Sequence, residues 1–206
     1  LIEIAERVFA EMKIPQAVLA LWRARLPSAA RWFVEAFERP RRAVIAGTWL
    51  EKKGALVFPA NGGDFTLVAR ADRIDRRADG HAAIIDYKTG ALPQKNWTAT
   101  FLAPQLPLEG AILAAGGFDG VPKMDVGELL YVKLSGGARP GEPRELENAA
   151  TLPGPALAKL QSLVALFDDP ATPYVPRVRP RTLDQEGDYD HLARVREWAP
   201  SGWEEE

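Results

Sequence analysis

Three residues, Asp72, Asp86 and Lys88, have the types and the spacing that metal-assisted hydrolysis requires. Residues two apart on a β-strand share a face, so Asp86 and Lys88 would present a carboxylate and an ammonium group together. Two carboxylates can hold a divalent cation that polarises a phosphoryl oxygen and helps to turn water into hydroxide, and a lysine nearby positions that water or offsets charge. The group therefore suits phosphodiester hydrolysis.

A short hairpin is expected to bring Asp72 beside the strand that carries Asp86. Residues 64–75 alternate well enough to predict a strand, and residues 82–88 are predicted as the next strand. Asp79-Gly80 between them is a common turn pair, so the second strand should fold back along the first. The two carboxylates would then converge.

Two further oxygen donors are candidates for the same cation. The backbone carbonyl of Tyr87 directly follows Asp86, and hard cations accept carbonyl ligands, whereas the Tyr87 side chain should point away and pack. Glu51 belongs to a strand predicted at 44–58 and could approach the metal, although a surface or structural role is the alternative. Asp-x-Lys triplets also occur as simple ion pairs, so the triplet alone does not establish catalysis.

The composition limits the cofactors. The chain has 206 residues, of which 47% are hydrophobic, and this fits one globular domain. The absence of cysteine excludes disulfides, thiolate zinc sites and cysteine-ligated iron-sulfur clusters. With only two histidines, Mg2+ on carboxylates is the expected cofactor and Mn2+ its substitute. No apolar run is long enough for a membrane span and no signal peptide is recognisable, so we expect a cytoplasmic protein without a membrane partner.

The charge distribution leaves nucleic-acid binding open. The formal net charge of −2 does not indicate a nucleic-acid binder. Arginines are nevertheless grouped, and each group could contact phosphates or simply pair with the many acids. The groups are Arg39, Arg41 and Arg42; Arg70, Arg73, Arg76 and Arg77; and Arg177, Arg179 and Arg181.

The chain is predicted to form a single domain of residues 1–206 with a mixed central β-sheet flanked by helices, an α/β architecture. Residues 1–41 are predicted as helices with a break at Pro27-Ser28, and residues 42–168 as the core. Residues 169–206 are predicted as an extended tail with a short helix near its end.

Within the core, the pattern after the hairpin predicts two helices and one more strand. The helices are expected within residues 104–115, ending at Gly116-Gly117, and at residues 152–167. A strand is expected at residues 128–134, followed by a Gly/Pro-rich loop at residues 135–143.

Three strings together resemble the RecB-like branch of the PD-(D/E)XK nucleases: Ala-Arg-Ala-Asp72-Arg-Ile-Asp75, Ile-Ile-Asp86-Tyr-Lys88-Thr-Gly90 and Pro104-Gln105-Leu-Pro-Leu-Glu109. The resemblance implies a restriction-endonuclease-like core in which Asp72 and Asp86 bind metal and Lys88 is catalytic. Gln105 matches a glutamine that contacts DNA. Glu109 stands where these nucleases usually have tyrosine, which leaves its role open.

The tail, from Gly187 to Trp198, resembles the end of AddB, a subunit of alphaproteobacterial AddAB helicase-nucleases. This resemblance implies an AddA partner, with ATP used only by helicase regions outside this chain. Many AddB relatives hold an iron-sulfur cluster through four cysteines, and no such cluster is carried over. A histidine ligand common before the strands has no counterpart in residues 1–50, either because this member lacks it or because a longer protein has been truncated.

The resulting prediction is a Mg2+-dependent DNA exonuclease that acts on a single strand from unwound duplex and processes double-strand break ends for recombinational repair. Two alternatives remain. One is a catalytically silent nuclease-like domain that binds DNA or a partner subunit. The other is a stand-alone endonuclease of restriction or repair type.

Overall fold

A five-stranded mixed sheet forms the centre of the molecule in the computed structural model, which describes residues 1–94, 97 and 100–174. The strands lie in the order β1-β2-β3-β4-β5, and only β3 and β4 are parallel. Their bounds are β1 Ile45–Ala60, β2 Gly63–Arg77, β3 Ala82–Lys88, β4 Val126–Leu134 and β5 Gly141–Glu145. The mixed sheet predicted from the sequence is thereby confirmed.

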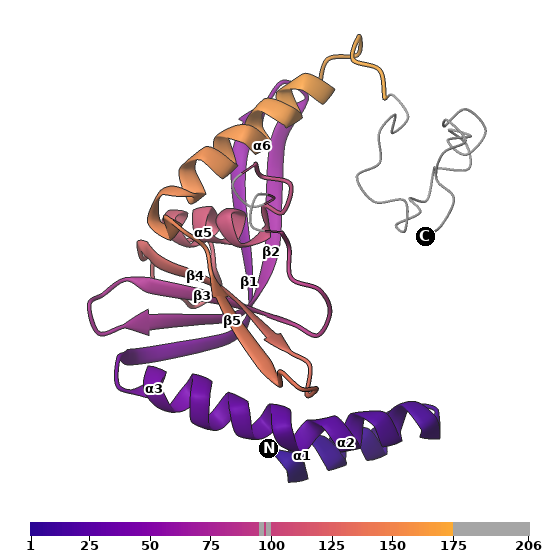
Figure 1. Cartoon of the computed structure of the whole chain (residues 1–206). Coiled ribbons are helices and arrows are strands. Elements are labelled where there is room, and N and C mark those ends of the chain that lie inside the picture. The colour runs from indigo at the N-terminus through magenta and orange to yellow at the C-terminus, as the bar shows by residue number, and fades with distance from the viewer. Residues whose placement is uncertain (95–96, 98–99, 175–206) are drawn as a thin grey trace, which may run out of the picture.

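Helices cover both faces of this sheet (Figure 1). One face carries the N-terminal helices α1 (Ile2–Glu11), α2 (Gln16–Trp32), the π-helix η1 (Phe33–Glu38) and α3 (Arg39–Arg42). The other face carries α5 (Gln105–Ala115) and α6 (Pro153–Phe167), with the short 3-10 helix η2 (Ala149–Thr151) before α6.

Strand alternation separates two apolar cores. Ile84 and Leu129 point to the α5 face and pack with Ile112. Ile85 and Leu130 point to the opposite face and pack with Phe37 of the π-helix. Each strand residue near the candidate site is therefore assigned to one face by its position alone.

The elements that frame the site were predicted closely. The β2–β3 hairpin is antiparallel as expected, and β3 has the predicted bounds. Strand β1 pairs antiparallel with β2. Helix α5 ends at Ala115 and is capped by Gly116, whose φ of 79° is the left-handed conformation that favours glycine.

The predicted break at Pro27-Ser28 is wrong. Pro27 lies inside α2, and the helical path continues through η1 into α3. Ser28 does not cap a new helix, because it lies inside α2. Its hydroxyl is within hydrogen-bonding distance of the carbonyl oxygens of Arg25 (2.9 Å) and Gly136 (3.0 Å). Packing of Phe37 against the sheet supports the continued helix.

The loop predicted at residues 135–143 is wrong in its last three residues, 141–143, which belong to β5. An edge strand tolerates Pro143, because one side of it needs no partner. Gly141 is required there, since a Cβ at this residue would lie 2.0 Å from the ring of Trp32.

The predicted helix near the end of the tail and the third arginine group lie outside the described residues. Among the residues that are described, no helix is long and apolar enough to cross a membrane.

Candidate active site

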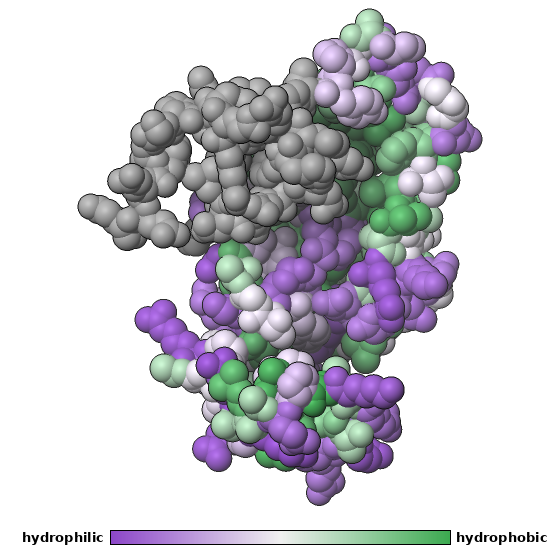
Figure 2. Space-filling view, turned by 90° about the vertical axis from the view of Figure 1, so that its right-hand side faces the viewer, coloured by the Kyte–Doolittle hydropathy of each residue, from purple (hydrophilic) through white to green (hydrophobic). Residues whose placement is uncertain are grey.

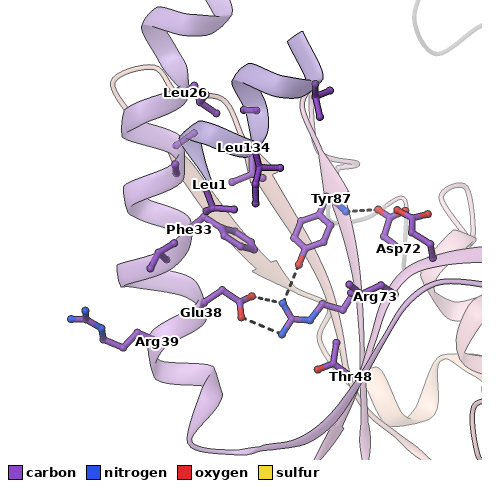
Figure 3. A pocket seen from close by; sticks show the side chains of 18 of the residues that line it. Leu1, Leu26, Phe33, Glu38, Arg39, Thr48, Asp72, Arg73, Tyr87 and Leu134 are labelled. Carbon is purple, nitrogen blue, oxygen red and sulfur yellow. Dashed lines mark hydrogen bonds and ion pairs between the residues drawn. The ribbon is translucent and has the colours of Figure 1, made fainter. Parts of the chain in front are cut away.

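Asp72 and Asp86 meet where β2 and β3 separate. The pairing of these strands ends at Arg73 opposite Ile85. Beyond it, Oδ2 of Asp72 accepts a hydrogen bond of 2.9 Å from the backbone N–H of Tyr87 (Figure 3). The Asp72 carboxylate therefore lies against the backbone next to Asp86, as the hairpin predicted.

Lys88 completes the predicted triplet. Its Nζ lies 2.9 Å from Oδ1 and 2.7 Å from Oδ2 of Asp86, so the shared strand face does bring the two groups into contact. Asp86 is only 3% exposed, and this burial raises the pKa of its carboxyl. The hydrogen bond from Lys88 lowers the pKa of Asp86 and the negative charge of Asp72 raises it again.

Gln105 links the strand residues to helix α5, where it is the first residue. Its Nε2 donates to Oδ1 of Asp86 at 2.6 Å, and its Oε1 accepts from Nζ of Lys88 at 3.2 Å. Gln105 is itself exposed and thus remains accessible to a substrate.

Glu109 is the residue that the sequence did not assign to the site. It is 2% exposed, and its Oε1 accepts from Nε2 of Gln105 at 3.1 Å. Burial raises the pKa of Glu109 to about 7, and the charges of Asp86 and Asp72 add to that shift. The spacing from Gln105 to Glu109 was the available signal, because residues four apart in a helix share a face.

Glu51 lies on β1 across from Asp72 and lines the same cavity. It is exposed and forms an ion pair of 2.9 Å with Arg70. Its φ of 52° is uncommon for a residue with a side chain. The structure thus places Glu51 beside Asp72, with its carboxylate paired to Arg70 and without a described contact to Asp86 or Lys88.

Two arginines proposed as phosphate contacts, the buried Arg73 and the partly buried Arg41, form ion pairs on the opposite face of the sheet. Arg73 pairs with Asp75 at 2.8 Å and with Glu38, and Arg41 pairs with Glu128 at 2.8 Å. We call these five residues the arginine cluster. Burial lowers the pKa of Arg73, but its hydrogen bonds to Asp75 and Glu38 outweigh this effect and leave that pKa raised.

The side chain of Tyr87 joins the arginine cluster to the site. Its hydroxyl contacts Nη1 of Arg73 at 3.2 Å, and its ring packs edge-on against Phe33 (Figure 3). The backbone N–H of Tyr87 also donates the hydrogen bond to Asp72 described above. Tyr87 packs as predicted, and only its backbone faces the site.

A cavity of about 1070 Å³ lies between the N-terminal helices and the sheet. Its walls are mostly apolar side chains such as Val8 and Phe33, and Asp72 lines one end. Figure 2 shows apolar side chains exposed among polar ones over these helices, in the lower part of the view. Leu1, Ile4 and Val8, which line this cavity, are 46 to 56% exposed.

The donor atoms suit a hard cation. Asp72, Asp86 and Glu109 place carboxylates within electrostatic range of one another, with Lys88 as the cation beside them. Within the described ranges, no three acidic, histidine or cysteine side chains form a ready-made metal site. A site built from two carboxylates and a backbone carbonyl is compatible with both observations. We call Asp72, Asp86, Lys88, Gln105 and Glu109 the carboxylate cluster.

The chain belongs to the PD-(D/E)XK nuclease superfamily, whose sequence profile matches residues 1–201. Members of this superfamily are usually nucleases that use divalent metals such as Mg2+. The family and the mixed sheet agree with the fold predicted from the three motif strings.

Similar curated proteins come from Rickettsia. An uncharacterized protein of Rickettsia felis is 31% identical over 119 residues, which cover 58% of this chain and 14% of that protein. A counterpart in Rickettsia conorii is 30% identical over 118 residues, covering 57% and 14%. The chain thus spans about one seventh of these relatives. The crystal structure of SSO0001 aligns with a TM-score of 0.36 and 15% identity, covering 78% of this chain and 66% of that one.

Proposed function

We propose that this chain is a Mg2+-dependent deoxyribonuclease domain. The observation that carries the proposal is the convergence of Asp72, Asp86 and Lys88 where β2 and β3 separate. Membership of the nuclease superfamily supports the same conclusion.

Asp72, Asp86 and the backbone carbonyl of Tyr87 would hold the cation, and Glu51 is a further candidate that would have to leave Arg70. When bound, Mg2+ polarises a phosphoryl oxygen and lowers the pKa of water. Mn2+ should substitute, because it accepts the same oxygen ligands.

Lys88 has a separate role in the proposed reaction. Its ammonium group lies against Asp86 and can orient the attacking water or offset negative charge on the phosphoryl group. Gln105 is exposed at the start of α5 and is the proposed contact to DNA. Arg39 and Arg42 line the adjacent cavity and are exposed, so they remain available to phosphates.

At the level of the longer protein, we propose an exonuclease domain of AddB type. AddA would be its partner, and ATP would be used only in helicase regions outside this chain. Its substrate would be a single strand from unwound duplex at a double-strand break in the cytoplasm. The resemblance of residues 187–198 supports this assignment, as does the far greater length of the Rickettsia relatives. The alternative is a catalytically silent domain that binds DNA or a partner subunit, and the intact triplet favours activity.

The test is digestion of linear single-stranded DNA, with closed circular DNA alongside, in Mg2+ or Mn2+. The lanes compare the wild type, Asp86→Ala and an EDTA control. We expect metal-dependent loss of linear DNA that disappears in the variant and in EDTA. Nicked circles would indicate the endonuclease alternative, and DNA binding without cleavage in any lane would indicate the silent domain.

A further inference from the structure

We propose that Glu109 is a positioning residue, which acts through Gln105 to hold Asp86 and Lys88 in place. The inference rests on the proposed function for its effect on cleavage. Its effect on the ammonium group of Lys88 can be measured without that function.

The amide of Gln105 has different partners at its two ends. Lys88 can only donate a hydrogen bond, and it faces Oε1 of Gln105 at 3.2 Å. Oδ1 of Asp86 and Oε1 of Glu109 both accept from Nε2, at 2.6 and 3.1 Å. Nε2 carries two hydrogens, so each carboxylate can receive one. A reversed amide would set its oxygen against both carboxylates, and the three partners together therefore fix one orientation.

Glu109 makes no other side-chain hydrogen bond in the part of the chain that the structure describes. Its Oε2 is buried and unpartnered there. Burial of such a group is costly, and the neighbouring positions of α5, such as Leu106 and Leu113, are buried apolar residues. A leucine would fit this environment at less cost, so the contact with Gln105 is what distinguishes glutamate here.

A role as a third metal ligand fits less well. Among residues 1–94, 97 and 100–174, no three acidic, histidine or cysteine side chains are grouped to hold one ion. The hydrogen bond to Gln105 instead connects Glu109 to both residues of the triplet that lie on β3. Gln105 thus positions Asp86 and Lys88, and its exposed surface remains available to contact DNA.

The first experiment records the NMR signal of the Lys88 ammonium group in metal-free protein. The signal is assigned by its loss in Lys88→Met. A held ammonium exchanges slowly with water and gives a resolved signal. We expect Glu109→Leu to shift or broaden this signal, and Glu109→Gln to keep it, since the amide oxygen of glutamine still accepts from Gln105. An unchanged Lys88 signal in Glu109→Leu would overturn the proposal.

The second experiment compares DNA cleavage in Glu109→Leu and Glu109→Gln, each alone and combined with Gln105→Leu. We expect kcat to fall about 10- to 100-fold in Glu109→Leu with little change in KM, the size found for partners that orient active-site groups. Glu109→Gln should keep most of the wild-type kcat. In the Gln105→Leu background, Glu109→Leu should cause no further loss of kcat. An equal loss in both backgrounds contradicts action through Gln105. A wild type without cleavage but with the expected Lys88 response would refute the proposed function and leave this inference standing.

Discussion

The arginine cluster and the carboxylate cluster lie on opposite faces of the same strands and differ in how their charges are matched. In the arginine cluster, Asp75 and Glu128 each have an arginine within 4 Å, and Glu38 pairs with Arg73. Arg77 approaches Glu128 at 3.7 Å as an additional cation. Buried charges are thus neutralised by neighbours of opposite sign.

In the carboxylate cluster, Lys88 is the only cationic side chain that interacts with Asp72, Asp86 and Glu109 among the residues that the structure describes. Burial raises the pKa of Asp86 and Glu109, which shows that negative charge is unfavourable there without a further cation. The matched charges of the arginine cluster are explained by a contribution to folding stability. The carboxylate cluster makes more sense as a binding site, because its missing positive charge can come from a ligand.

The largest expected effect comes from disrupting the charge balance of the arginine cluster. Arg73→Met leaves Asp75 and Glu38 without their main partner in a buried setting, so the free energy of unfolding should fall by about 3–5 kcal/mol. Urea denaturation monitored by circular dichroism measures it. The control is Arg70→Met, whose exposed pair should matter by less than about 1 kcal/mol. Equal stability of the two variants would contradict a structural role for the arginine cluster.

Lys88→Ala should separate chemistry from metal binding in the carboxylate cluster. Loss of one group that stabilises developing charge reduces kcat about 100- to 1,000-fold. Metal affinity should be kept or improved, because a competing cation is removed. Initial rates on single-stranded DNA and calorimetric Mn2+ titration check the two parts. Retained cleavage would remove Lys88 from the mechanism.

The unmatched charge should also appear as a pH dependence of stability. The folded protein retains the Glu109 proton up to a pKa of about 7, whereas the unfolded chain releases it near 4.5. The stabilisation is therefore complete below pH 4.5 and is lost as pH rises through 7, by up to about 3 kcal/mol in metal-free protein. Denaturation from pH 4.5 to 8 should show this decrease in wild type and a flatter profile in Glu109→Gln. Parallel profiles would contradict the assignment.

The smallest expected effect concerns Glu51. Because this residue is exposed and paired with Arg70, Glu51→Gln should change kcat/KM by less than about threefold, in line with exposed ion pairs. Steady-state cleavage at subsaturating DNA gives the ratio. A loss approaching that of Asp86→Ala would instead make Glu51 a metal ligand.

Local patterns predicted the part of the site that lies on the strands. Alternation placed Asp86 and Lys88 on one face, and the Asp79-Gly80 turn was enough to bring Asp72 beside them. The helix carrying Gln105 was also predicted, but its approach to Asp86 depends on packing between distant segments. The burial of Glu109 follows from that packing, and no local pattern reports it.

Other misses have the same origin. The pairing of Arg41 with Glu128 joins residues 87 apart in the chain, so the sequence alone left Arg41 as a candidate for phosphates. The sequence predicts a helix break at Pro27 and a loop through Pro143. Packing of the N-terminal helices on the sheet accommodates Pro27, and the edge position of β5 accommodates Pro143.

The central claim is that the carboxylate cluster is a cation site. Titration of metal-free protein with Mn2+, followed by electron paramagnetic resonance of the free ion, tests it most directly in wild type and Asp86→Asn. We predict saturable binding by the wild type and a dissociation constant at least about tenfold higher in Asp86→Asn, because a ligand is lost. Equal Mn2+ binding by both proteins, or none by either, would contradict the account.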